Sequence, residues 1–197
     1  MSLDRTVTIA EGIERLHTSR HAWVMYGLIR SLCPHSVVEV GAWHGFCTLH
    51  LAQALEDNGA GVVTVIDNFS LQNDAVAIHN NLNRAKLGHR LNIINGKSSE
   101  VQWPAQVDFA FIDGDHSLQG CLDDCNKAIQ RGAVCVCIHD TVGWWGPRDY
   151  VEMFRKESAG QWDVMEFGYD SGFTVLLKQF PKPPVFYSEK DYPEGHV

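Results

Sequence analysis

The side chains best suited to chemistry stand at the ends of apolar runs. Carboxylate, imidazole and hydroxyl groups gather at residues 39–45, at Asp67, and at residues 95–99, 113–116 and 139–141. Such a carboxylate can accept hydrogen bonds from ribose hydroxyls, two carboxylates can share a hard cation, and an imidazole can move a proton near neutral pH. The sequence therefore predicts one site, assembled from several strand ends.

Residues 38–48 join an apolar run to a helical pattern, and two glycines frame the turn between them. Gly41 and Gly45 let backbone amides approach a ligand because no Cβ stands in the way. By itself, the segment is explained equally well by a tight structural turn. Asp67 ends the next apolar run, where nucleotide-binding α/β folds place a carboxylate for ribose hydroxyls. Together the two signals indicate a nucleotide-like ligand.

Three motifs in the chain share the spacing of one enzyme family. They are Glu39-x-Gly41-x-x-x-Gly45, Asp67 at a strand end, and Phe111-Ile-Asp113 at another. These motifs resemble those of class I S-adenosylmethionine (SAM)-dependent methyltransferases. More narrowly, residues 39–46 resemble the first loop of catechol-type, metal-dependent O-methyltransferases, while residues 111–117 and 138–140 resemble small bacterial methyltransferases of that kind. The resemblance covers about residues 35–178.

The resemblance implies SAM as the cofactor. Asp67 would hold the ribose, Ser98 would lie beside the adenine, and Glu39 with the two loop glycines would surround the methionine and ribose parts. The expected cofactor-binding residues are Glu39, Gly41, Ala42, Trp43, Gly45, Asp67, Ser98 and Asp113. NAD is the competing ligand, but its G-x-G-x-x-G fingerprint is absent and bulky Trp43 and Phe46 would obstruct a pyrophosphate.

Asp113 and Asp140 end two strands that are expected to be neighbours, so their carboxylates can converge on Mg²⁺ or another divalent cation such as Ca²⁺. The resemblance places the residues at Asp113, Asp140 and Thr141 in the metal site. Thr141 is a departure, because the catechol enzymes carry an amide there. His139 is not favoured as a ligand, since neighbours within a strand point to opposite faces. Alternatively, Asp140 caps the next segment and Asp113 binds backbone amides.

His116 stands where the catechol enzymes place a basic lysine, and an imidazole titrates near neutral pH. His116 is therefore the expected catalytic base, removing a proton from the acceptor hydroxyl. A purely structural role, such as capping the helix that begins at Ser117, explains the residue equally well. Aromatic residues at 43–44 and 144–145 are expected either to wall the substrate site or to pack in the core.

We expect O-methylation of a small hydroxylated metabolite with a divalent metal. The alternatives are a metal-independent N-methyltransferase and a non-catalytic SAM- or nucleotide-binding protein of the same fold. The partner is a small-molecule acceptor, and a homodimer is left open.

Elements that alternate along the chain must position these residues. Apolar, β-branched runs predict five strands at residues 36–41, 61–67, 91–95, 107–113 and 133–140. Helical patterns fall at residues 1–30, 46–57, 71–87, 118–130 and 148–157. Two further strands, at 162–167 and 172–178, are joined by so short a link that they must pair antiparallel.

This pattern predicts an α/β fold with a doubly wound, mostly parallel seven-stranded sheet, the Rossmann-like methyltransferase fold, and an antiparallel closing strand. Residues 1–34 are expected to form an N-terminal helical segment, 35–180 the methyltransferase domain and 181–197 a proline-rich extended tail.

The composition is that of an ordinary globular protein, with 45% hydrophobic and 20% charged residues in 197. A net charge of -8 gives no electrostatic reason to expect a nucleic-acid partner. No apolar run approaches the roughly 20 residues of a membrane span, so a cytoplasmic protein without a membrane partner is expected. The six cysteines lie on predicted core elements and are expected to be reduced.

Overall fold

The structure is a computed structural model that describes residues 20–69, 75–158, 160–169 and 171–180. In chain order the elements are α2 (Arg20–Leu32), β1 (Ser36–Val40), α3 (Phe46–Asn58), β2 (Val62–Asp67), α4 (Ala75–Arg84), the short 3-10 helix η1 (Gly88–Arg90), β3 (Leu91–Asn95), β4 (Phe109–Ile112), α5 (Leu118–Gln130), β5 (Cys135–His139), α6 (Trp145–Glu157), β6 (Trp162–Phe167) and β7 (Phe173–Lys178).

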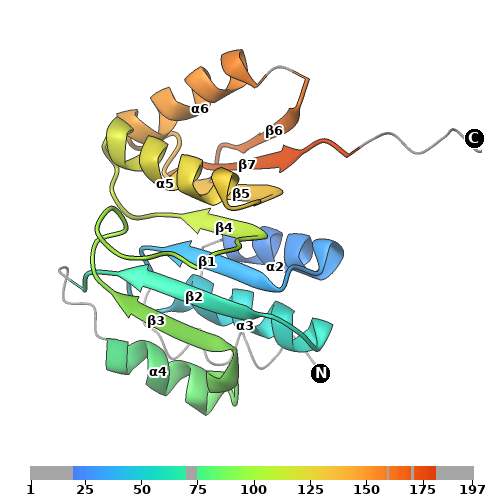
Figure 1. Ribbon diagram of the computed structural model, residues 1–197, viewed down its shortest axis with the longest axis vertical. Helices are drawn as coiled ribbons and strands as arrows, with labels where there is room; N and C mark the ends of the chain where they lie inside the picture. Colours follow the sequence, from blue (N-terminus) through green and yellow to red (C-terminus); the bar gives the residue numbers. More distant parts are fainter. Residues whose placement is uncertain (1–19, 70–74, 159, 170, 181–197) are drawn as a thin grey trace, which may run out of the picture.

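Seven strands form one sheet in the order β3-β2-β1-β4-β5-β7-β6 (Figure 1). Strands β1 to β5 are parallel, whereas β7 runs antiparallel to both β5 and β6. The predicted seven-stranded, doubly wound sheet with antiparallel closing strands is confirmed. The strand order reverses between β1 and β4, so loops that leave these two strands diverge and open a crevice.

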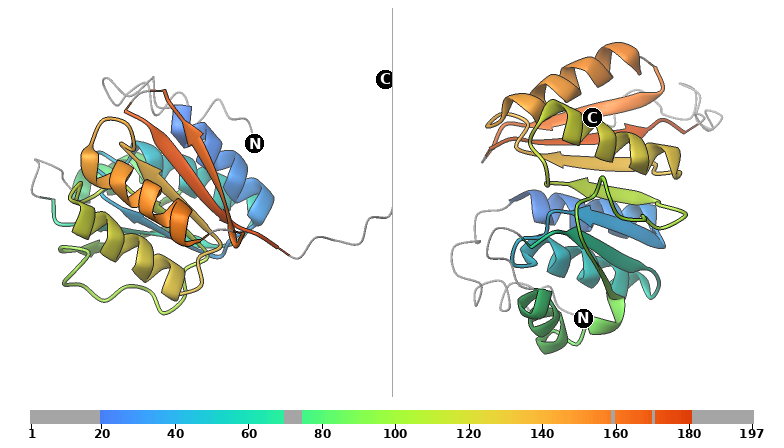
Figure 2. Two further views of the ribbon diagram at one scale, coloured as in Figure 1. Left: turned by 90° about the horizontal axis from the view of Figure 1, so that it is seen from above. Right: turned by 60° about the vertical axis from the view of Figure 1, so that its left-hand side comes forward.

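Helices cover both faces of the sheet (Figure 2). Helices α2, α3 and α4 pack on one face and α5 and α6 on the other, and each face has its own apolar core. Successive strand residues alternate between the two cores: Val37 and Phe111 belong to the first, Val38 and Ile112 to the second. Burial on both faces explains why these strands read as continuous apolar runs in the sequence.

Several predicted boundaries move by a few residues. Strands β4 and β5 are shorter than expected, which leaves Asp113 and Asp140 just beyond the strand ends. Helix α6 begins at Trp145 instead of residue 148, because Pro147 lies in its first turn, where a missing N–H costs no helical hydrogen bond. Helix α4 ends at Arg84, and left-handed Lys86 (φ 62°) follows it.

Other predictions fall partly or wholly outside the described residues. These are the helix before Arg20, the start of the helix predicted at 71–87, and the tail at 181–197. Among the described residues, no helix is long and apolar enough to cross a membrane. All six cysteines are free; five are buried, and Cys33 is exposed, contrary to its expected place in the core.

Candidate functional site

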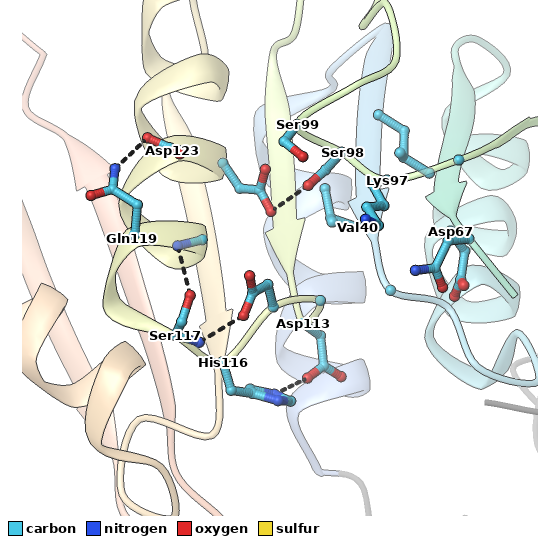
Figure 3. Close-up of a pocket in the computed structure, with 18 of the residues that line it drawn as sticks. Val40, Asp67, Lys97, Ser98, Ser99, Asp113, His116, Ser117, Gln119 and Asp123 are labelled. Atoms are coloured by element: carbon cyan, nitrogen blue, oxygen red, sulfur yellow. Dashed lines mark hydrogen bonds and ion pairs between the residues drawn. The ribbon is translucent and has the colours of Figure 1, made fainter. Parts of the chain in front are cut away.

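A cavity of about 530 Å³ opens at the carboxyl ends of β1, β2, β3 and β4 (Figure 3). We call the part around Gly41, Asp67 and Ser98 the glycine end. The acidic end consists of Asp113, His116, His139 and Asp140; the first two line the cavity and the other two contact them. The cavity therefore lies at the reversal of strand order, where ligands bind in open α/β sheets.

Gly41 allows the loop after β1 to pass against the loop after β4. Its φ is 78°, and a Cβ there would collide with the backbone carbonyl of Asp113. Gly45, with φ 82°, precedes the first residue of α3. Only glycine combines a positive φ without strain with room for a close backbone contact. The motif glycines therefore set the shape of the cavity wall.

Asp67 holds the first loop from the end of β2. Its Oδ2 accepts a hydrogen bond of 2.8 Å from the Ala42 amide, and its Oδ1 accepts one of 2.7 Å from the Phe69 amide. The side chain is almost fully buried yet lines the cavity. A carboxylate has about four acceptor sites, so these two bonds leave capacity for hydroxyl donors of a ligand.

Glu39 lies fully buried behind the same loop. Thr48 Oγ1 donates a 2.5 Å hydrogen bond to its Oε2, while Oε1 has no partner among the described residues. Burial raises the pKa of Glu39 to about 8. Glu39 thus retains an unused acceptor, although it does not itself line the cavity.

The loop after β3 carries Ser98 at the far side of the glycine end. Ser98 Oγ donates to Asp124 Oδ2 at 3.0 Å, and its carbonyl accepts from Trp103 Nε1 at 2.9 Å and Lys127 Nζ at 2.7 Å. Asp124, on α5, is almost completely buried and also lines the cavity, and burial raises its pKa to about 6. These contacts fix Ser98 at the cavity wall.

Two carboxylates and an imidazole face one another at the acidic end. His139 Nδ1 lies 3.2 Å from Asp113 Oδ1 and 3.3 Å from Asp140 Oδ1. These three residues offer ligand atoms within 4.8 Å of one another, a grouping that could hold a metal ion. The reason for disfavouring His139 required both residues to lie in the strand; Asp140 instead lies beyond it with a left-handed φ of 60° and turns back toward His139.

His116 approaches the same carboxylates from the loop after β4. Its Nε2 lies 2.9 Å from Asp140 Oδ2 and 3.5 Å from Asp113 Oδ1, and its ring stacks on Trp144 with centroids 5.0 Å apart. Asp113 and Asp140 raise the pKa of His116 to about 10. The imidazole is therefore protonated at neutral pH in this arrangement, whereas the sequence argument assumed titration near neutrality.

The other residues predicted for the metal and substrate sites are Thr141 and three tryptophans. Thr141 is buried, and Thr174 on β7 donates a 3.0 Å hydrogen bond to its hydroxyl oxygen. Trp43, Trp144 and Trp145 are all exposed, so core packing does not explain them; Trp43 lines the cavity.

Residues 38–141 match the methyltransferase domain family, a span of more than half the chain. The chain belongs to this family. Its fold is similar to those of many solved structures, including three methyltransferases. The O-methyltransferase TomG from Streptomyces achromogenes, in complex with SAM, has a TM-score of 0.70 and 18% identity over 91% of this chain and 92% of that one.

The other two structures contain S-adenosylhomocysteine (SAH). The Podospora anserina methyltransferase PaMTH1 has a TM-score of 0.67 and 15% identity, over 90% of this chain and 88% of that one. The Bacillus cereus O-methyltransferase has a TM-score of 0.64 and 17% identity, over 89% of both chains. At these identities the likeness is one of fold, and no curated protein matches the sequence.

Sequence reasoning missed two residues at the site of this methyltransferase. Asp124 shares the buried face of α5 with Cys121, Cys125 and Ala128, so an acid on an otherwise apolar helical stripe was the available signal. His139 carried no such signal, because its contact with Asp140 depends on one backbone dihedral angle after the strand.

Proposed function

We propose that this methyltransferase binds SAM and transfers its methyl group to a hydroxyl oxygen of a small acceptor. The observation that carries the proposal is one cavity lined by Asp67 at one end and by Asp113 and His116 at the other. The cavity thus has a carboxylate that could bind ribose hydroxyls at one end. At the other end it has carboxylates and an imidazole that could accept a hydroxyl proton. The SAM and SAH bound in the solved structures of similar fold support this cofactor.

The glycine end fits the cofactor by its donor and acceptor groups. Asp67 has acceptor capacity for the two ribose hydroxyls, and Ser98 lies across the same cavity for the adenine. Oε1 of Glu39 has no partner among the described residues, and a positively charged amino acid part of SAM near the first loop would lower the raised pKa of Glu39 and favour its charged form. That loop lacks the G-x-G-x-x-G fingerprint for a pyrophosphate, which matches a cofactor without phosphate.

The acidic end fits a divalent cation, since its two carboxylates and His139 are grouped as ligands. Asp113 and Asp140 would hold the ion, together with Thr141, which follows Asp140 in the sequence. When bound, the cation supplies positive charge that lowers the pKa of an acceptor hydroxyl. Through the ion, these three residues would orient the acceptor oxygen next to the cofactor cavity.

His116 is the proposed base for the hydroxyl proton. Its pKa of about 10 reflects two carboxylates that carry their full negative charge. Neutralising Asp113 and Asp140 would return the imidazole toward its ordinary pKa and allow Nε2 to accept a proton. The stacking on Trp144 holds the ring in place for that transfer.

A second candidate is methyl transfer to nitrogen without a metal. The observation that favours it is the position of His116, whose protonated ring already places a positive charge against Asp113 and Asp140. An amine acceptor needs positioning more than activation, so no cation would be required.

Incubation with ¹³C-methyl-labelled SAM and a set of hydroxylated and amino-substituted small molecules tests both candidates. NMR spectra distinguish a methyl group on oxygen from one on nitrogen, and a chelator reports on the need for metal. We expect an O-methyl product that disappears when the chelator is added. An N-methyl product that forms equally well with chelator present would replace the first candidate with the second.

A further inference from the structure

The acidic end contains a nitrogen ligand where the sequence predicted only oxygens. His139 Nδ1, Asp113 Oδ1 and Asp140 Oδ1 are separated by 3.2 and 3.3 Å along the two contacts of the imidazole. Adjacent ligands in an octahedral site with bonds of about 2.1 Å are roughly 3 Å apart. Two of the three spacings therefore match those of ligands around one small cation, and all three residues offer ligand atoms within 4.8 Å of one another.

The backbone after β5 is shaped to bring the last two ligands together. His139 is the last residue of β5, and a continued strand would turn Asp140 to the opposite face. Asp140 instead adopts a left-handed φ of 60°, a conformation that Asp and Asn adopt more readily than other residues with a side chain. This turn of the backbone brings the Asp140 carboxylate back to 3.3 Å from His139 Nδ1.

The ring of His139 is fixed from behind by the N-terminal helix. His21 on α2 packs against it with ring centroids 4.4 Å apart, and His21 is itself almost fully buried. Phe111 contacts His139 from β4, with ring centroids 6.4 Å apart. A ligand ring held by packing does not need to reorganise when a cation binds.

Some polar atoms at this end lack a hydrogen-bond partner within the described part of the chain, although His139 Nδ1 is hydrogen-bonded to Asp113 Oδ1 at 3.2 Å. The Nε2 atoms of His116 and His139 are buried without a hydrogen-bond partner among the described residues. His116 Nε2 lies close to Asp140 Oδ2 but without hydrogen-bond geometry. Meanwhile the hydroxyl of Thr141, the predicted third oxygen ligand, accepts a hydrogen bond from Thr174. The donor set that remains directed at one point is Asp113, His139 and Asp140.

We propose that His139 is a metal ligand of this methyltransferase, and that the site selects a divalent first-row transition metal over Mg²⁺ and Ca²⁺. The proposal rests on the proposed function only in assuming that the acidic end holds a cation. Mg²⁺ and Ca²⁺ prefer oxygen ligands, whereas an imidazole nitrogen favours metals such as Co²⁺ and Zn²⁺. One imidazole and two carboxylates would hold the ion, which could then also bind acceptor oxygens.

Metal titrations of the full chain, with and without SAH, test the proposal directly. The probes are Co²⁺ and Mg²⁺, followed by calorimetry, and Mn²⁺, followed by pulsed electron paramagnetic resonance. We expect the wild type to bind Co²⁺ at least 100-fold more tightly than Mg²⁺. We also expect nitrogen coupling in the Mn²⁺ spectrum.

The deciding variant is His139→Asn, which replaces the nitrogen ligand with an amide oxygen. It should bind Co²⁺ at least 10-fold more weakly, bind Mg²⁺ nearly as well as the wild type, and lose nitrogen coupling. His89→Asn is the matched control, because His89 pairs with Glu56 and is largely exposed; its metal affinities should equal those of the wild type. His139→Gln provides a second variant if His139→Asn does not fold by circular dichroism.

Three outcomes would overturn the proposal: no cation binds the wild type, Mg²⁺ binds as tightly as Co²⁺, or His139→Asn keeps the preference for Co²⁺. Weakened metal binding in Thr141→Val with unchanged binding in His139→Asn would assign the third ligand to Thr141 instead. SAH binding is measured separately. Its absence would overturn the proposed cofactor without deciding the metal.

Discussion

The glycine end of the cavity is held together by glycines and backbone amides, whereas the acidic end is held by charged side chains that face each other. At the glycine end, Asp67 is satisfied by the amides of Ala42 and Phe69. At the acidic end, His116 and His139 each keep a buried nitrogen without a hydrogen-bond partner among the described residues. The first region is thus ordered by its own backbone contacts while Asp67 keeps acceptor capacity for a ligand, and the second brings two carboxylates and two imidazoles within ion-pair distance of each other.

Gly41→Ala should have the largest effect, because it breaks the backbone approach that joins the two ends. The added Cβ would collide with the Asp113 carbonyl at a positive φ, at a cost of about 3 kcal/mol or more in unfolding free energy. Gly59→Ala is the matched control. Gly59 has φ 79°, but no atom of the described residues would lie within 4 Å of the added methyl carbon.

Urea unfolding followed by circular dichroism measures both variants. The control should lose only about 1 kcal/mol, the cost of a left-handed conformation alone. Equal losses in the two variants would mean that the contact with Asp113 contributes nothing.

His116→Ala should affect the acidic end alone. We expect kcat to fall by about 10²- to 10⁴-fold, the usual contribution of a general base, with SAH affinity nearly unchanged. His79→Ala, on the exposed side of α4, is the control and should keep the wild-type rate. Single-turnover rates across pH, measured once an acceptor is known, provide the check. A variant that retains the wild-type rate and acidic limb would exclude His116 as the base.

Asp67→Ala should affect the glycine end. Removing the ribose acceptor should weaken SAH binding by about 2 kcal/mol, because hydrogen bonds to a carboxylate are stronger than neutral ones. Asp67→Asn keeps one acceptor oxygen and should show a smaller loss. Calorimetry gives both affinities, and an unchanged value for the alanine variant would remove Asp67 from the ribose site.

A buried histidine on another element, α3, provides a further contrast with His116. Burial lowers the pKa of His50 on α3 to about 4, so His50 is neutral in the folded protein. The unfolded chain takes up a proton below pH 6.5, and stability is therefore lost as the pH falls from 6.5 toward 4. The loss attributable to His50 between about pH 7 and pH 5.5 is about 1 kcal/mol.

His50→Gln should remove that part of the pH dependence, as measured by urea unfolding at the two pH values. The glutamine amide can still donate toward the Phe46 carbonyl, which accepts a 3.0 Å hydrogen bond from His50 Nδ1. An unchanged difference between the two pH values would show that His50 does not titrate on unfolding.

The glycine end could be predicted from the sequence more fully than the acidic end, because it depends on local backbone geometry. The spacing of Gly41 and Gly45 and the strand-terminal Asp67 encode backbone geometry locally, and the order of apolar runs predicted the sheet. The partnership of His139 with Asp140 depends on one left-handed residue, and the pKa of His116 depends on two carboxylates from different loops. Neither property is encoded in the spacing of residues along the chain.

The central claim is that this methyltransferase binds SAM in the cavity between β1 and β4. Calorimetric titration of SAH and NAD into the purified protein tests it most directly. We predict that SAH binds with one site per chain and that NAD does not bind, because the first loop lacks the G-x-G-x-x-G fingerprint for a pyrophosphate and bulky Trp43 lines the cavity there. Binding of NAD without binding of SAH would contradict the account.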